Sequence, residues 1–323
     1  MSFCVTDPLA IFGALGDATR LRILALLRRM ELSVGELAQV LGQSQPRVSR
    51  HVKILVDAGL AERRKEGSWV FVVLGEPHVV GPVTAALEAW GDAPGAATDA
   101  QRLDAVRADR AASAAAWFQA HAGEWDAIRS LHVAESEVEA AMAAALGDMA
   151  VGVLVDIGTG TGRMLELFAG RARHALGIDR SSEMLRLARA KLAGVANAEL
   201  RQADLYALPL EDGAADVAIL HHVLHFAIAP GAAIAEAARA LGPGGRLLIA
   251  DFAPHDREEL RSRDAHVRLG FSDVQIGAWF EAAGLDMART DVLDADPLNG
   301  GALTVKLWLG RKAGARLQEV RAA

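Results

Sequence analysis

The sequence has almost no cysteine and no long uninterrupted apolar run. Among its 323 residues Cys4 is the single cysteine, which excludes an internal disulfide bond and a cysteine-rich metal site. No apolar stretch reaches the roughly 20 residues that span a bilayer, so no membrane partner is expected. The first residues have neither a basic start nor an apolar core followed by a cleavage site, so no secretion signal is expected. These absences favour a cytoplasmic protein.

Acidic residues outnumber basic residues overall, but not in the first quarter of the chain. The whole chain has 34 Lys and Arg against 41 Asp and Glu, whereas residues 1–75 carry 10 Lys and Arg against 7 Asp and Glu. The length suggests two domains of roughly 150 residues each, and a hydrophobic fraction of 52% can fill their cores. Opposite net charge in the two parts indicates two different partners.

The most informative stretch runs from Leu154 to Arg163 and reads LVDIGTGTGR. Its apolar, β-branched beginning is typical of a parallel strand that is covered on both faces. Gly158, Gly160 and Gly162 then permit a tight turn and a close approach to a ligand, because glycine has no Cβ. The free N–H groups of the helix that follows would face such a ligand. A purely structural turn is the alternative, since tight connections between a strand and a helix also favour glycine.

A second apolar run ends in an acid, Asp179, which lies 23 residues after Asp156. In nucleotide-binding α/β folds an acid at this place accepts hydrogen bonds from ribose hydroxyls. The glycine loop differs in its spacing from both the phosphate loop and the dinucleotide fingerprint. The combination therefore argues for a ribose contact and against a pyrophosphate ligand.

From about residue 150 to residue 312 the sequence resembles the class I S-adenosylmethionine-dependent methyltransferases. The resemblance rests on landmarks that occur in order, namely Asp156–Gly162, Asp179, Gln202–Asp204, Asp216–His225 and Leu241–Ile249. It implies a doubly wound, Rossmann-like α/β fold with S-adenosylmethionine as cofactor. Alternating strands and helices fit this fold, and the strands are expected near residues 151, 174, 198, 215, 246, 286 and 302.

The resemblance also implies which residues bind the cofactor. Asp179 would bind the ribose, Arg180 and Leu205 would flank the adenine, and Asp204 would bind the adenine amino group. Capping of a turn is the alternative role for Asp204. The full set of expected cofactor-binding residues is Asp156, Gly158, Gly160, Gly162, Asp179, Arg180, Asp204, Leu205 and His221.

Methyl transfer needs in-line placement of a nucleophile on the sulfonium methyl group, and it needs a base only where the nucleophile carries a proton. The candidates for such a base are His221, His222, His225, Asp251 and His255, with His221 and His255 placed first. At each position a histidine that is hydrogen-bonded for structural reasons is the alternative. The lone cysteine argues against arsenite methylation, because a soft arsenic substrate would be expected to need several thiolates.

The first 75 residues predict short helices followed by a hairpin. The stretch 33–36 fits a capping box, and Ser44 is placed to cap a further helix that ends at Gly59. Two short strands, 61–65 and 69–73, would then pair around a turn that contains glycine.

Two helices joined by a short turn, of which the second is rich in basic and polar side chains, describe a winged helix-turn-helix domain. The second helix would be the recognition helix, and the hairpin would be the wing. The side chains expected to contact double-stranded DNA are Ser44, Gln45, Arg47, Ser49, Arg50, His51, Lys53, Arg63 and Lys65. A small helical bundle with a solvated basic face is the alternative.

Residues 15–24 and 48–60 closely resemble the ArsR-type winged-helix repressors. That family is best known for metal sensing, but the helix that often carries a cysteine pair has no thiol here. One histidine after the wing, His78, does not make a site, so no metal is expected. The resemblance implies a homodimer formed by the terminal helices, to which Leu87 and Trp90 would add apolar contact. A role in the core is the alternative for these two residues.

Glycine, proline and small polar residues over 91–99 predict a linker. The expected domains are a DNA-binding domain at 1–90, a linker with a helical connector or cap at 91–148, and a methyltransferase domain at 149–312. In the connector Trp117, Phe118 and Trp125 have the spacing of a packing face, and a bare spacer is the alternative.

The fusion suggests a transcriptional regulator whose DNA occupancy depends on S-adenosylmethionine or on its demethylated product, S-adenosylhomocysteine. The alternative is an active small-molecule methyltransferase with an accessory DNA-binding head. An interaction scaffold with an inactive pocket is disfavoured by the complete set of acids and glycines.

Overall fold

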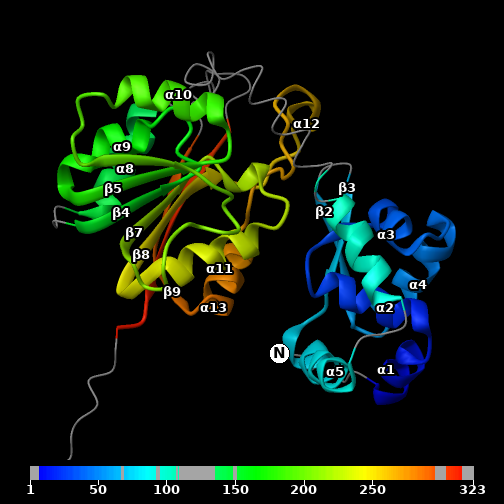
Figure 1. Cartoon of the computed structure of the whole chain (residues 1–323). Helices are drawn as coiled ribbons and strands as arrows, with labels where there is room; N and C mark the ends of the chain where they lie inside the picture. Colours follow the sequence, from blue (N-terminus) through cyan, green and yellow to red (C-terminus); the bar gives the residue numbers. More distant parts are fainter. Residues whose placement is uncertain are drawn as a thin grey trace, which may run out of the picture. The chain divides into compact units, whose positions relative to one another are not determined.

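A computed structural model describes residues 7–66, 69–91, 95–106, 108, 135–147, 151–294 and 303–314. The chain forms two compact units, Met1–Ala112 and Ser113–Ala323 (Figure 1). Within the described ranges no helix is long and apolar enough to cross a membrane.

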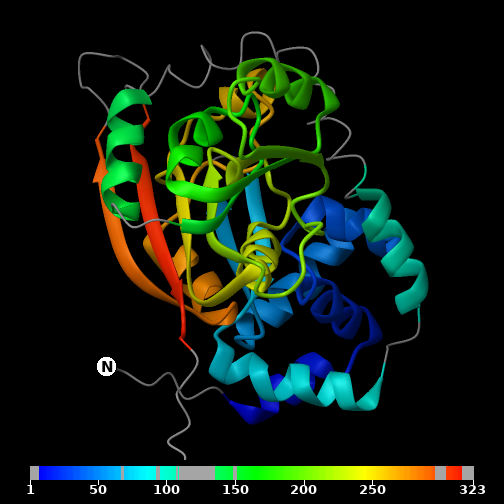
Figure 2. The same ribbon diagram turned by 60° about the vertical axis from the view of Figure 1, so that its left-hand side comes forward.

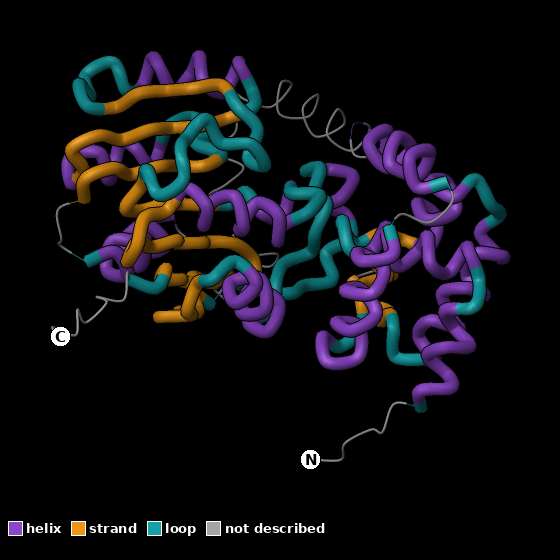
Figure 3. The backbone as a smooth tube through the Cα atoms, turned by 60° about the horizontal axis from the view of Figure 1, so that its bottom comes forward, coloured by secondary structure: helices purple, strands orange, loops and turns teal. Residues whose placement is uncertain are grey.

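The first unit consists mainly of helices and contains one small sheet (Figure 3). Its named elements are α1 (Pro8–Leu15), α2 (Ala18–Leu27), β1 (Leu32–Ser33), α3 (Val34–Leu41), α4 (Gln45–Asp57), β2 (Ala61–Glu66), β3 (Trp69–Leu74) and α5 (Pro77–Trp90). The strand order in the sheet is β1-β3-β2, and both pairings are antiparallel. This is the expected winged helix-turn-helix fold, with α3 and α4 as its two helices and β2–β3 as its wing.

Local sequence signals set the helix boundaries in this unit. The expected capping box is present at the start of α3, where the Glu36 N–H donates to the Ser33 hydroxyl and the Ser33 N–H donates to the Glu36 carboxylate. The helix ends at Gly42, whose φ of 65° is easily adopted only without a Cβ. Ser44 occupies the N-cap position of α4 as expected, but its side chain makes no capping hydrogen bond.

A further helix at 96–106 also belongs to the first unit. Its Leu103 side chain is fully buried, and the Asp99 carboxylate accepts a hydrogen bond of 2.6 Å from Nε of Arg22 on α2. Arg102 donates to the carbonyl of Val40, in the last turn of α3. This helix overlaps the stretch for which the composition predicts a linker, because the pairing of Asp99 holds it against α2. The expected aromatic face of the connector lies outside the described residues.

The second unit contains a seven-stranded sheet in the order β6-β5-β4-β7-β8-β10-β9. Its strands are β4 (Val151–Ile157), β5 (Ala172–Asp179), β6 (Ala198–Gln202), β7 (Ala215–His221), β8 (Leu241–Phe252), β9 (Leu285–Leu293) and β10 (Val305–Lys312). The first five strands in that order are parallel, and β10 runs antiparallel to both of its neighbours. The sequence therefore predicted the doubly wound, Rossmann-like sheet correctly. The strand order reverses between β4 and β7, and in folds of this kind ligands bind beyond the carboxyl ends of the strands at such a point.

Helices cover both faces of this sheet. They are α8 (Glu135–Leu146), α9 (Arg163–Phe168), α10 (Ser182–Lys191), α11 (Pro230–Ala240), α12 (Glu259–Arg263) and α13 (Asp273–Ala282), together with two short 3₁₀ helices, η2 (Ala169–Arg171) and η3 (Leu224–Phe226). One apolar core lies between the sheet and α8 with α9, and a second lies between the sheet and α11 with α13. Figure 2 shows α8 beside β9 and β10, which it contacts along with β8.

Candidate cofactor pocket and DNA-binding surface

The glycine loop after β4 is tied to the end of β5. The Gly158 N–H donates to the Ile178 carbonyl at 2.7 Å, and the Gly160 N–H donates to the Asp179 carboxylate at 2.9 Å. Gly158, Gly160 and Gly162 have φ values of 73°, 53° and 84°, which side chains rarely permit. A Cβ at Gly158 would also lie 2.5 Å from a methyl group of Val223. The glycines are therefore required by the turn itself, and the N–H groups of Gly158 and Gly160 tie the loop to the end of β5.

Asp179 is the last residue of β5 and lies beside the glycine loop. Its second carboxylate oxygen accepts a hydrogen bond from the Ser181 N–H at 2.8 Å. Burial raises the pKa of Asp179, and the N–H groups of Ser181 and Gly160 partly oppose that rise. Fixed N–H donors hold the carboxylate in one orientation at the end of β5. A ribose diol could be recognised there.

Asp156 lies near the end of β4 and Asp204 follows β6, so the two acids lie on the strands that flank β5. Asp156 is buried, and its carboxylate accepts a hydrogen bond of 2.6 Å from the Thr159 hydroxyl, which braces the glycine loop. Asp204 follows β6 and accepts a hydrogen bond from the Tyr206 N–H at 3.0 Å. Asp204 therefore caps this turn, which is the alternative role given above. Leu205 is partly buried and Arg180 is exposed.

A buried cluster of histidines lies after β7 and β8. His225 Nδ1 is 2.8 Å from an oxygen of Asp251, whose carboxylate also accepts hydrogen bonds from the backbone N–H groups of Leu224 and Phe252. Burial raises the pKa of Asp251 to about 6, although the nearby His222 and the backbone donors act against that rise. Asp251 therefore fixes the orientation of the His225 ring.

The two preferred base candidates differ in their surroundings. His221 ends β7, and its Nε2 lies 3.3 Å from the Glu135 carboxylate at the start of α8. His255 lies further along the chain after β8, where its Nδ1 accepts a hydrogen bond from the Arg257 N–H at 3.2 Å. This hydrogen bond fits the structural role that is the alternative to a role of His255 as a base. Glu135 was not among the expected site residues, because it lies 86 positions before His221 in a stretch without a motif.

The expected recognition helix α4 exposes most of its polar side chains. Its apolar face, formed by Val48, Val52 and Leu55, is fully buried. The expected DNA-contacting residues that are exposed on this helix or its cap are Ser44, Gln45, Arg47, Arg50 and Lys53. Ser49 and His51 are partly buried, and Nδ1 of His51 lies 3.6 Å from Asp17. His51 is therefore turned toward the cap of α2 more than toward solvent.

The basic side chains of the wing strand β2 alternate between its two faces. Arg63 lies opposite Val72 of β3, and Lys65 lies opposite Val70. The side chains of Arg63 and Lys65 are exposed. Arg64 lies between them and forms an ion pair with Glu31. Because side chains alternate between the faces of a strand, Arg63 and Lys65 share one face. Two cations on one side of a hairpin suit contact with phosphates.

Comparison with known proteins agrees with this division. Residues 17–63 match the model of the bacterial regulatory protein arsR family, and residues 155–249 match a methyltransferase domain. The arsenical resistance operon repressor of Escherichia coli (strain K12) is 45% identical over 94 residues, which are 28% of this chain and 76% of that protein. The demethylmenaquinone methyltransferase of Clavibacter sepedonicus is 32% identical over 100 residues, which are 31% of this chain and 41% of that protein.

A solved structure shares the fold of the second unit. It is a chain of the complex between the Haloferax volcanii Trm112 methyltransferase activator and the putative methyltransferase, with a TM-score of 0.51 and 22% identity over 61% of this chain and 97% of that chain. Fold and sequence together define a winged-helix regulator domain fused to a Rossmann-like methyltransferase domain. The chain belongs to the arsR family of bacterial regulatory proteins.

Proposed function

We propose that this protein is a transcriptional regulator whose binding to an operator depends on S-adenosylmethionine or S-adenosylhomocysteine held in its methyltransferase domain. The observation that carries this proposal is the contact of the Gly160 N–H with Asp179, which sets the acid proposed to bind a ribose against the glycine loop. The same chain carries an exposed, arginine-bearing recognition helix. Binding to DNA would place the protein in the cytoplasm.

In this proposal the cofactor lies across the carboxyl ends of β4, β5 and β6. Asp179 would accept hydrogen bonds from the ribose hydroxyls, and Leu205 would contact the adenine. Asp204 would bind the adenine amino group with the carboxylate that also caps its turn. The methionine part would lie against Gly158 and Gly160, where a β-carbon would obstruct it.

Coupling between the two ligands needs a physical connection. At one end of residues 107–134, the helix at 96–106 is held to the first unit by Asp99 and Arg22. At the other end, Glu139 of α8 makes two hydrogen bonds, of 2.6 and 2.8 Å, with the guanidinium of Arg163 directly after the glycine loop. A ligand that shifts this loop would thus act on α8. The anchoring at both ends supports transmission through the connector.

We also propose that the protein is a homodimer through its first unit. Leu9 and Phe12 lie three residues apart on α1, and they are 78% and 71% exposed. Two large apolar side chains on one helix face suit burial against a second copy of the chain. A dimer of winged-helix domains would read two half-sites of one operator.

A second function, transfer of a methyl group to a small molecule, is favoured by the buried histidines beside the loop. His222 directly precedes Val223, whose methyl groups pack against Gly158. A base in this cluster could remove a proton from an acceptor as the methyl group is transferred. In that case the winged helix would be an accessory head.

The deciding experiment measures operator affinity with no ligand, with S-adenosylmethionine and with S-adenosylhomocysteine, on a duplex first selected from random DNA by the protein itself. A coupling of about 1–3 kcal/mol would change the affinity about five- to 150-fold, and operator DNA would change cofactor affinity by the same factor. Equal operator affinity in all three conditions would refute the sensor. Many turnovers of demethylated cofactor with an added metabolite would instead establish the enzyme.

A further inference from the structure

We propose that Glu135, His221 and His222 form a binding site for a divalent transition metal ion, at the carboxyl edge of the sheet in the second unit. This inference goes beyond the proposed response to S-adenosylmethionine and does not depend on it. The sequence predicted no metal ion, on the basis of the DNA-binding domain and the single cysteine. The present proposal differs from that prediction and places the ion in the second unit.

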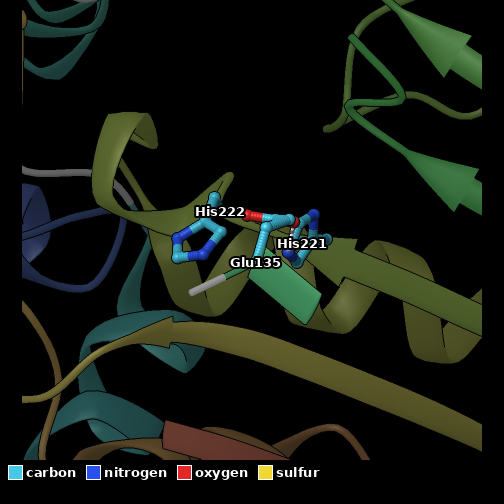
Figure 4. A group of neighbouring side chains, drawn as sticks. All are labelled: Glu135, His221 and His222. Atoms are coloured by element: carbon cyan, nitrogen blue, oxygen red, sulfur yellow. Dashed lines mark ion pairs between the residues drawn. The ribbon is translucent and has the colours of Figure 1, made fainter. Parts of the chain in front are cut away.

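The three side chains converge although they come from separate parts of the chain. Nε2 of His221 lies 3.3 Å from the Glu135 carboxylate, and one ligand atom from each of the three residues lies within 4.8 Å of the others. Figure 4 shows the Glu135 carboxylate between the two imidazole rings. Two ligands that are each about 2.1 Å from a tetrahedral ion are about 3.4 Å apart, so His221 and Glu135 already have this separation and His222 would have to close by at most about 1.4 Å.

The backbone of His222 supports a ligand role. Its φ of 53° is in the left-handed region, which is uncommon for a residue with a side chain. The His222 N–H donates to the Ala250 carbonyl at 2.8 Å, which holds the residue in this conformation. Such conformations are unfavourable for a residue with a side chain and cluster at functional sites. Here the conformation turns two consecutive imidazoles to one carboxylate, whereas neighbouring side chains on an extended strand would point to opposite faces.

The surroundings resemble those of an ordered metal centre. His221 and His222 are only 7% and 4% exposed, which limits competition from water. The next layer contains the His225–Asp251 pair, and ligand atoms of His222, His225 and Asp251 also lie within 4.8 Å of one another. Outer partners of this kind orient the ligands of a metal ion.

The donor set selects the chemical class of the ion. Two imidazoles and one carboxylate suit zinc or ferrous iron, whereas magnesium and calcium prefer a shell of oxygen ligands. Three protein ligands leave a position for a further ligand, which is typical of a catalytic ion more than of a closed structural one. Because Glu135 is the first residue of α8, the bound ion would also join α8 to the end of β7.

The test is titration of the chelator-treated full chain with zinc chloride in a calorimeter, and with cobalt chloride followed by visible absorption. We expect one ion per chain for the wild type, with cobalt bands of a four- or five-coordinate site. His222→Gln and Glu135→Gln should each weaken zinc binding at least 10-fold. The matched control is His174→Gln, which removes a histidine that pairs with Glu199 at the surface, 3.3 Å away, and it should bind as the wild type does.

Two further results decide against the site. Absence of zinc binding to the wild type at millimolar zinc would overturn the proposal, and so would equal binding by all four proteins, because the ion would then lie elsewhere. Circular dichroism shows that each variant is folded. Should His222→Gln unfold, Glu135→Gln alone still decides, since it keeps the shape of the side chain and removes its charge. The cofactor plays no part in these measurements, so failure of the proposed function would leave their outcome unchanged.

Discussion

The Asp99 carboxylate receives two hydrogen bonds from the Arg22 guanidinium, which joins the helix at 96–106 to α2 of the DNA-binding head. Asp99 is 3% exposed, so its charge is almost fully withdrawn from water and depends on this partner. The pairing raises the pKa of Arg22 and keeps its guanidinium charged. The connector thus begins from a fixed point on the head.

Removal of Arg22 should release that helix. Arg22→Ala leaves a buried carboxylate without its cation, which costs about 3 kcal/mol in comparable buried pairs. We expect amide hydrogen exchange over 96–106 to accelerate by roughly 100-fold, since about 1.4 kcal/mol corresponds to a factor of ten. Arg28→Ala is the control, because its partner Glu88 is 63% exposed and such pairs contribute at most about 1 kcal/mol. Equal exchange in the two variants would contradict the anchoring role.

Substitutions in the glycine loop should abolish cofactor binding. Gly160→Val places a β-branched residue at a φ of 53° and fills the space of the ligand, so no heat of binding should remain. Asp179→Ala should weaken binding by about 1.5–3 kcal/mol through loss of hydrogen bonds to a charged group. Gly170→Ala is a matched control, since a Cβ there meets nothing within 4 Å. Unchanged affinity in both site variants would remove the pocket assignment.

The pH dependence of cofactor binding should follow Asp179. Its raised pKa means that the ionised form, which accepts ribose hydroxyls, is lost on acidification above the ordinary range of an aspartate. The linkage to stability has the opposite sign, because the folded state holds the proton more tightly than the unfolded state. That contribution to the free energy of unfolding is present below the unfolded pKa and is lost as the pH rises through the folded pKa.

Both effects can be measured on the same protein. Calorimetric affinity for S-adenosylmethionine should fall as the pH is lowered toward the ordinary titration range of an aspartate, whereas the share of the unfolding free energy that comes from Asp179 should rise. Asp179→Asn removes the titrating group, so it should reduce the pH dependence of both the cofactor affinity and the unfolding free energy. An unaltered pH profile in that variant would show that another group is responsible.

Binding to DNA should separate into base-reading and phosphate-binding contributions. Loss of a bidentate contact from Arg47 or Arg50 should cost about 1–3 kcal/mol at one operator position. Loss of Arg63 or Lys65 should weaken binding to every sequence alike and reduce the salt slope by about 0.9 per contact. Arg186→Ala is the control, since this arginine pairs with Glu183 on α10 of the second unit. An Arg47 and Arg50 double variant that protects the same operator at the same concentration would contradict the role of α4.

The oligomeric state should depend on α1. Leu9→Asp combined with Phe12→Asp would place two charges in the proposed interface, so a dimer should become a monomer in light scattering. Val274→Asp serves as the control, since Val274 is 82% exposed on α13 of the second unit. A wild type that is monomeric at micromolar concentration, or a double variant that stays dimeric, would contradict this interface.

The sequence alone was sufficient for the elements that depend on local chemistry. The glycines at 158, 160 and 162 predicted the turn after β4, because a positive φ is a property of a single residue. The capping box at 33–36, together with Ser44 and Gly59, predicted the two helices of the DNA-binding fold, because helix boundaries are set by contacts within three or four residues. The order of strands and helices, with the landmarks at the strand ends, then indicated the doubly wound sheet.

Only the tertiary structure decided which distant charged and polar side chains meet. Arg22 and Asp99 are 77 positions apart, and composition placed Asp99 in a linker; burial of the pair reverses that interpretation. Glu135 reaches His221 because α8 packs along the sheet, a contact that no spacing in the sequence encodes. His51, expected to contact DNA, lies 3.6 Å from Asp17 because α4 packs on α2. Local propensity acts over a few residues, whereas such pairs are selected by the free energy of packing whole elements together.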